Sequence, residues 1–131
     1  MVDFYQTLQP AALCRLGELY APGAFFKDPF NEVTGVPAIE RIFRHMFAQV
    51  ADPRFVVTTR LRDGGQAMLA WTFAFGHEPR RITVRGVSHL VFDAQGRVVR
   101  HRDYWDPAEE LYARLPLIGP LMRWLRRRLA A

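Results

Sequence analysis

The decisive segment is Gly96-Arg97-Val98-Val99-Arg100-His101-Arg102-Asp103-Tyr104-Trp105-Asp106-Pro107, which begins at a turn residue and then alternates its side-chain types. A period of two is typical of a β-strand, whose successive side chains point to opposite faces. The pattern places His101, Asp103 and Trp105 together on one face. Because a histidine beside a carboxylate is a common acid–base unit, this face is a candidate catalytic face. The alternatives are a surface ion pair at a sheet edge or a hydrogen-bonded core histidine.

A second acidic motif lies near the start of the chain, where Phe26-Lys27-Asp28-Pro29-Phe30-Asn31 ends a short apolar run. A carboxylate in apolar surroundings can take and return protons without a cofactor. Asp28 is therefore a candidate general base. The alternative is that Asp28 caps the turn at Asn31.

Turn residues divide the chain into helices followed by strands. A long helix is expected to open at Gly35 and Pro37, because Pro37 suits a first helical turn and apolar residues recur at helical spacing up to Val50. A helix running from Pro10 to Tyr20 precedes it. Strands are expected over residues 24–27, 55–61, 66–76, 81–92 and 98–105. The order predicts an α+β fold, with helices packed on one face of a curved antiparallel sheet.

The length of 131 residues suits one domain, and half of the residues are hydrophobic. The formal net charge is +5, but residues 117–131 contain four arginines and no acid, so most of this charge is local. We therefore expect a body over 1–116 and a basic amphipathic helix over 117–131, and no nucleic-acid-binding surface. The helix either lies on an anionic membrane surface or folds back over the body.

The single cysteine, Cys14, rules out an internal disulfide framework and favours a cytoplasmic protein. The four histidines show no spacing typical of metal ligands, and the chain has no glycine-rich phosphate loop. We therefore expect neither a metal nor a cofactor.

Three patches, in this order and spacing, resemble the nuclear transport factor 2-like superfamily, and within it the SnoaL-like and ketosteroid isomerase-like proteins. The patches are residues 19–30, 35–39 and 88–105. The resemblance implies a cystatin-like cone, in which a curved antiparallel sheet wraps around a long helix and an apolar cavity. Members are often dimers that pair through the outer face of the sheet. Many are small enzymes (isomerases, cyclases and dehydratase-like lyases), and others only bind ligands.

The same resemblance aligns Asp28 with the proton-shuttling aspartate of the ketosteroid isomerases. Ser88 aligns with their protonated aspartate, and Phe4 with their tyrosine, while Tyr5 lies one residue out of register. A serine donates a weaker hydrogen bond to a developing oxyanion than a carboxylic acid does. Ketosteroid isomerase activity itself is therefore not expected.

The apolar strand over residues 66–76 has two different faces, and the register of the family turns its smaller side chains inward. An outer row of large rings, among them Trp71 and Phe73, would be too much exposed apolar surface for a monomer, which predicts a homodimer. One bulge would exchange the two faces. The predicted ligand contacts are Tyr5, Phe30, Met68, Thr72, Ser88 and Trp105.

These observations predict a small cofactor-free enzyme that performs acid–base chemistry on a hydrophobic molecule bearing a carbonyl or hydroxyl group. Asp28, or His101 together with Asp103, would move the proton. Two alternatives stay open at this point. One is a non-catalytic module that binds an apolar ligand, and the other is a membrane-peripheral or partner-docking protein that uses the C-terminal helix.

Overall fold

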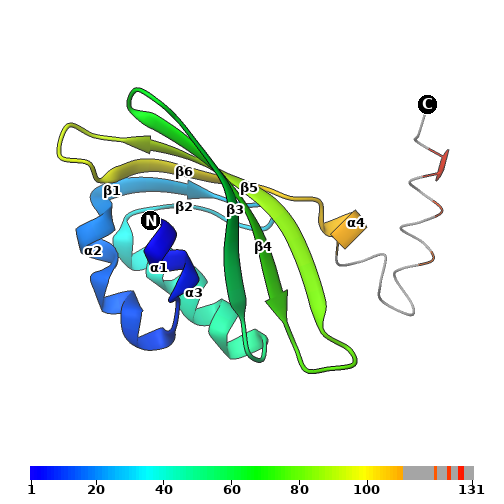
Figure 1. The fold of residues 1–131 in the computed structure, drawn as a ribbon. Coiled ribbons are helices and arrows are strands. Elements are labelled where there is room, and N and C mark those ends of the chain that lie inside the picture. The colour runs from blue at the N-terminus through cyan, green and yellow to red at the C-terminus, as the bar shows by residue number, and fades with distance from the viewer. Residues whose placement is uncertain (111–119, 121–123, 125–126, 129–131) are drawn as a thin grey trace.

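A curved sheet of six strands forms the body of the protein, in the order β2-β1-β6-β5-β4-β3 (Figure 1). The computed structural model describes residues 1–110, 120, 124, 127 and 128. The strands are β1 (Tyr20–Lys27), β2 (Glu32–Thr34), β3 (Arg54–Asp63), β4 (Gln66–Phe75), β5 (Ile82–Phe92) and β6 (Val98–Tyr104). β1 pairs parallel to β6, whereas the other neighbours are antiparallel. The sheet is therefore mixed, and the predicted antiparallel arrangement is wrong at that one pair.

β1 is longer than the sequence predicts, because it continues through Pro22 and Gly23 rather than starting after them. Its pairing with β6 shifts between Tyr20 and Phe25, which marks an irregularity at this point. A proline is tolerated in a strand at such an irregularity, where the ladder already lacks a hydrogen bond. Tyr20 consequently belongs to the sheet and not to the end of a helix.

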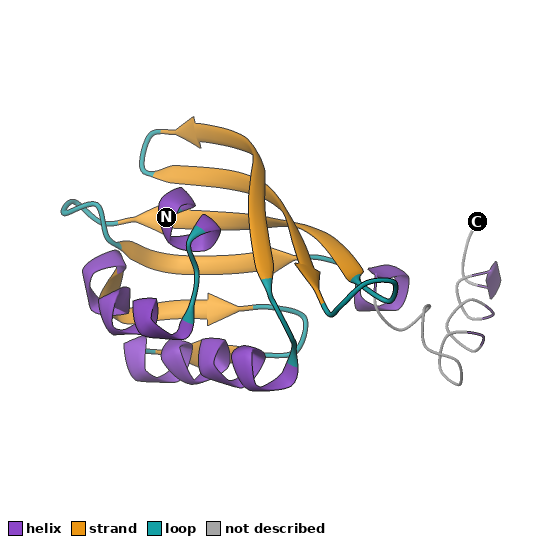
Figure 2. Ribbon diagram, turned by 60° about the horizontal axis from the view of Figure 1, so that its bottom comes forward, coloured by secondary structure: helices purple, strands orange, loops and turns teal. Residues whose placement is uncertain are grey.

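Helices cover the concave side of the sheet, as Figure 2 shows. They are α1 (Val2–Gln6), η1 (Pro10–Arg15), α2 (Leu16–Leu19) and α3 (Val36–Gln49), while α4 (Pro107–Glu110) follows β6. The predicted helix from Pro10 to Tyr20 is thus a 3-10 turn followed by a short α-helix. Leu13 and Leu16 are both buried, and a 3-10 turn brings side chains three residues apart to the same side.

α3 is fixed at its start by Gly35, which has a φ of 95° and donates its N–H to the carbonyl of Ala24 on β1 at 2.8 Å. A positive φ of this size suits glycine, which has no Cβ to clash. Pro37 occupies the first turn, where its missing N–H costs nothing. Ile39 and Phe43 on α3 are buried against the sheet.

The predicted C-terminal helix over 117–131, and the boundary placed at 116, concern residues that lie mostly outside the described part of the chain. Within the described residues, no helix is both long and apolar enough to cross a bilayer.

β4 turns its large side chains toward the concave side, which reverses the predicted faces. Trp71 is 5% exposed, whereas Met68 is 39% exposed, and Thr72 shares the outer face with Met68. The prediction that Met68 and Thr72 line the cavity is therefore wrong. Trp71 lies opposite Gly86 of β5, and the absence of a side chain there leaves room for the indole.

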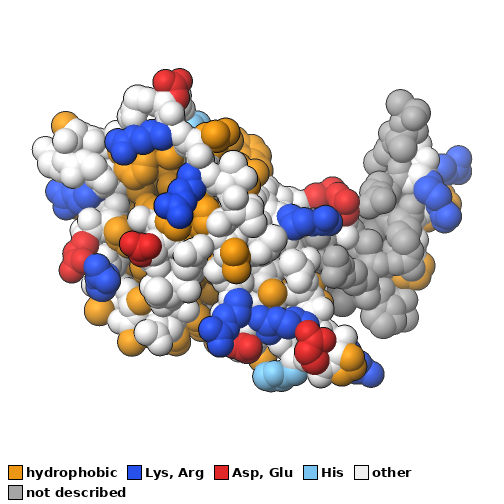
Figure 3. Space-filling view, in the orientation of Figure 1, with side chains coloured by type: hydrophobic (Ala, Val, Ile, Leu, Met, Phe, Trp, Pro, Cys, Tyr) orange, Lys and Arg blue, Asp and Glu red, His pale blue; other side chains and the backbone are white. Residues whose placement is uncertain are grey.

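This correction removes the row of exposed rings from which the dimer was argued, so the homodimer stays a prediction from the family resemblance. The outer side of the sheet and its edges still carry exposed hydrophobic residues such as Val56, Leu61, Met68 and Tyr104. Basic side chains are spread over the face of the molecule seen in Figure 3, with hydrophobic side chains between them.

Gly86→Ala tests the inward placement of Trp71. A Cβ at position 86 would meet Trp71 Cζ2 at 2.6 Å, so the indole would have to move. We expect a loss of about 1–3 kcal/mol in the free energy of unfolding, as for other overpacked cores. Urea denaturation measures it. Gly17→Ala is the control, because nothing lies within 4 Å of its added Cβ. Equal stability of the two variants would contradict the placement.

Candidate active site

A cavity of about 290 Å³ lies between α3 and the concave face of the sheet. Its walls are mostly aromatic and aliphatic, and they include Phe26, Phe43, Phe55, Trp71, Phe73 and Phe75. Phe30 and Trp105 also line it and meet edge-on, with ring centroids 5.5 Å apart. A small, largely apolar cavity with a few polar groups is the usual form of a small-molecule site. Tyr5, Phe30 and Trp105 are among the lining residues, and their predicted contact with a ligand stays a prediction.

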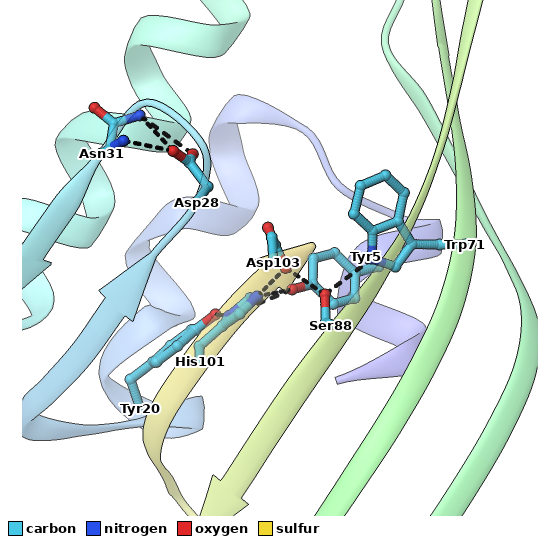
Figure 4. A network of polar contacts seen from close by, with 8 residues as sticks. All are labelled: Tyr5, Tyr20, Asp28, Asn31, Trp71, Ser88, His101 and Asp103. Atoms are coloured by element: carbon cyan, nitrogen blue, oxygen red, sulfur yellow. Dashed lines mark hydrogen bonds and ion pairs between the residues drawn. The ribbon is translucent and has the colours of Figure 1, made fainter. Parts of the chain in front are cut away.

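His101 is the centre of a buried polar network beneath this cavity (Figure 4). Its Nδ1 lies 2.6 Å from the hydroxyl of Tyr20, and its Nε2 lies 2.7 Å from Oδ1 of Asp103. The Tyr5 hydroxyl is 2.9 Å from Nε2 as well. The imidazole stacks on the ring of Tyr20, and Phe26 meets it at a steep angle, with centroids 4.7 Å apart. These contacts fix both the position and the orientation of the ring.

The hydrogen-bond partners assign the protons of this network. Because the carboxylate of Asp103 can only accept, Nε2 of His101 carries the proton and donates it to Oδ1. Nδ1 pairs with the hydroxyl of Tyr20. Both ring nitrogens therefore have a hydrogen-bond partner.

A second chain of donors reaches the same carboxylate oxygen. Trp71 Nε1 donates to Ser88 Oγ at 2.9 Å, and Ser88 Oγ donates to Oδ1 of Asp103 at 2.5 Å. Oδ2 of Asp103 has no hydrogen-bond partner among the described residues, and Figure 4 shows one carboxylate oxygen turned away from the network. The Asp103 side chain lines the cavity and is 16% exposed. One oxygen is therefore anchored, and the other is free to meet a ligand.

Asp28 also lines the cavity, but its carboxylate is occupied differently. Oδ1 accepts hydrogen bonds from the backbone N–H groups of Phe30 and Asn31 at 2.8 and 2.6 Å, and the Asn31 amide nitrogen lies 3.1 Å from Oδ1. This is the turn-capping arrangement that the sequence allowed as the alternative. The role of Asp28 as a general base stays a prediction.

Residues 1–101 match the model of the SnoaL-like domain family. The chain belongs to this family. A search of curated proteins found no match to the chain.

The SnoaL-like domain is also similar in fold to several solved structures. One is a protein with a ketosteroid isomerase-like fold from Catenulispora acidiphila, solved in complex with trimethylamine (18% identity, TM-score 0.71, covering 84% of this chain and 85% of that one). Another is described as a SnoaL-like polyketide cyclase from Jannaschia (16% identity, TM-score 0.70, covering 80% and 79%). A third is an LEH-like epoxide hydrolase from M. tuberculosis (18% identity, TM-score 0.67, covering 98% of this chain and 91% of that one). At these identities the likeness shows the fold alone.

The sequence analysis of this SnoaL-like domain missed two residues of the site. Tyr20 was placed at a helix end, and Trp71 on the outer face of its strand, whereas both contribute to the network. Ser88, expected as a ligand contact, is fully buried behind the wall and holds Asp103 instead. Phe4 packs edge-on against Phe43, so Tyr5 provides the tyrosine of the site.

Burial raises the pKa of the Tyr5 and Tyr20 hydroxyls well above the ordinary value of 10.0, because a phenolate would lose its hydration. The negative charge of Asp103 raises both pKa values further. Both phenols are therefore neutral hydrogen-bond donors or acceptors at physiological pH.

These raised pKa values predict alkaline instability. Above pH 10 the tyrosines of the unfolded chain ionise while Tyr5 and Tyr20 stay protonated in the fold, so the unfolded state binds fewer protons and the free energy of unfolding falls as pH rises. Ultraviolet absorbance of phenolate, followed with circular dichroism, measures this. Tyr20→Phe should weaken the pH dependence. Ionisation of all four tyrosines before unfolding would contradict the burial.

Ser88→Ala tests the second donor chain. The variant leaves the indole N–H of Trp71 without its acceptor and Asp103 Oδ1 without one donor. We expect a loss of about 1–3 kcal/mol in the free energy of unfolding, since a buried polar group is left unsatisfied. Thermal denaturation measures it, and Ser88→Thr, which keeps the hydroxyl, is the matched control. Full stability of Ser88→Ala would show that the network does not hold the fold.

Proposed function

We propose that this SnoaL-like protein is a small enzyme that moves a proton on an apolar small molecule held in the cavity. The observation that supports this most strongly is the carboxylate of Asp103, which lines an apolar cavity with one oxygen anchored and the other without a partner among the described residues. A positioned base near an apolar substrate accelerates proton transfer by about 100- to 10,000-fold.

In this proposal Oδ2 of Asp103 takes a proton from a carbon beside a carbonyl group and later returns it elsewhere on the same molecule. His101 and Ser88 keep Oδ1 in place, so the carboxylate does not need to reorient. The negative charge that develops on the substrate oxygen needs a donor. The neutral hydroxyl of Tyr5 lines the cavity and can supply it, because Nε2 of His101 already gives its proton to Asp103.

Two solved structures of the same fold carry enzyme names, a polyketide cyclase and an epoxide hydrolase, which supports an enzyme for this chain. The second candidate is a module that only binds an apolar ligand, and the largely apolar cavity walls favour it. A homodimer, a cytoplasmic location and membrane contact by the C-terminal helix stay predictions.

Base catalysis can be tested before the substrate is known, with 5-nitrobenzisoxazole as a probe. This molecule opens its ring to a coloured cyanophenolate when a base removes its carbon-bound proton. We expect the protein to accelerate the reaction and Asp103→Asn to lose about 100-fold or more of that acceleration. Absorbance of the product measures the rate.

Asp28→Asn and Asp63→Asn separate the possible bases. Asp63 is exposed, lies at the end of β3 and does not line the cavity, so its variant should keep the full rate. If only Asp28→Asn loses the rate acceleration, Asp28 rather than Asp103 is the base. Equal rates for the wild type and for both Asp103→Asn and Asp28→Asn would contradict the proposal and favour the binding module.

A further inference from the structure

We infer that the cavity takes a small organic cation, namely an apolar body that carries a protonated or quaternary amine. The inference rests on the proposed function, because it names the chemical class of the substrate for the same cavity. It is carried by the charges that line the cavity, by its aromatic walls and by its size.

The charge of the cavity is opposite to that of the rest of the molecule. The chain has 18 lysines and arginines against 13 aspartates and glutamates, and basic side chains are spread over the face seen in Figure 3. Among the described residues that line the cavity, the charged side chains are Asp28 and Asp103, and none is a lysine or arginine. The described lining also includes one histidine, His45 of α3, and its side chain is solvent-exposed.

No lysine or arginine pairs with Asp103 within the network. Its partner His101 donates from Nε2 to Oδ1, and Nδ1 pairs with the hydroxyl of Tyr20. Ser88 and Trp71 supply neutral donors. A carboxylate that is mostly withdrawn from water attracts a positive charge placed nearby, and this attraction does not require the ammonium to occupy the oxygen that takes the proton.

A wider surface hollow borders the same carboxylates from outside. Its lining includes Lys27 and Arg102 together with Asp28, Asp103 and Trp105. Arg102 follows His101 on β6, so its side chain points to the opposite face, where it lies 4.8 Å from the ring centroid of Tyr104. The basic groups therefore border the outer hollow and do not line the cavity.

The aromatic walls suit a cation for a separate reason. The face of an aromatic ring carries partial negative charge and attracts ammonium groups, and cages of several rings bind quaternary amines. Phe55 stacks on Phe73 at 4.3 Å between centroids and meets Trp71 edge-on at 5.5 Å. All three rings line the cavity that Asp103 also lines. A cavity of about 290 Å³ suits a body the size of a single ring that carries an amine.

The test compares two ligands of nearly the same shape, benzylammonium and benzyl alcohol, by isothermal titration calorimetry at pH 7. We expect benzylammonium to bind the wild type about tenfold more tightly or better. Asp103→Asn should lose this preference, because its binding of benzylammonium weakens more than its binding of the alcohol. Asp63→Asn is the matched control, because it removes the same charge outside the cavity.

The possible outcomes separate the cation inference from the proposed function. Equal or tighter binding of benzyl alcohol by the wild type would overturn the cation inference and leave the proposed function standing for a neutral substrate. Binding of neither ligand would overturn both. A preference that survives in Asp103→Asn but disappears in Asp28→Asn would assign the cation to the other carboxylate, and one that survives in both variants would refute the role of the carboxylates. Because the wild-type comparison needs no variant, it stands even where a variant does not fold.

Discussion

The hydrogen bonds of His101 connect three parts of the chain that are far apart in sequence. The ring lies on β6 and is fully buried, and it meets Tyr5 from α1, Tyr20 from the start of β1 and Asp103 from β6. A buried polar ring is costly unless each nitrogen finds a partner. The contacts that orient the carboxylate therefore also constrain the positions of α1 and β1 relative to β6.

Neighbouring side chains hold the carboxylate of Asp103 in one orientation. Within the described residues, no group of three histidines, cysteines or acids is placed to hold a metal ion. In the network, Ser88 and His101 donate to one oxygen of Asp103, while the other faces an apolar space. Because the donors are already in place, the carboxylate does not have to reorganise when a ligand binds.

The sequence predicted that His101 and Asp103 share one side of β6, because alternation along a strand needs only local information. It failed on β4, where both faces are apolar and the pattern does not say which one is inside. The deciding feature there is the pairing of Trp71 with Gly86 on another strand, which depends on register. Tyr20 was missed for a similar reason, since the irregularity that admits Pro22 into β1 depends on pairing with β6.

The proton assignment of His101 is the claim on which the rest depends, and long-range proton–nitrogen NMR tests it most directly. The signal of this ring is assigned by its loss in His101→Gln. The account predicts that Nε2 carries a proton and that this proton is protected from exchange with water. A proton on Nδ1 with none on Nε2 would contradict it, because Asp103 would then lose its donor.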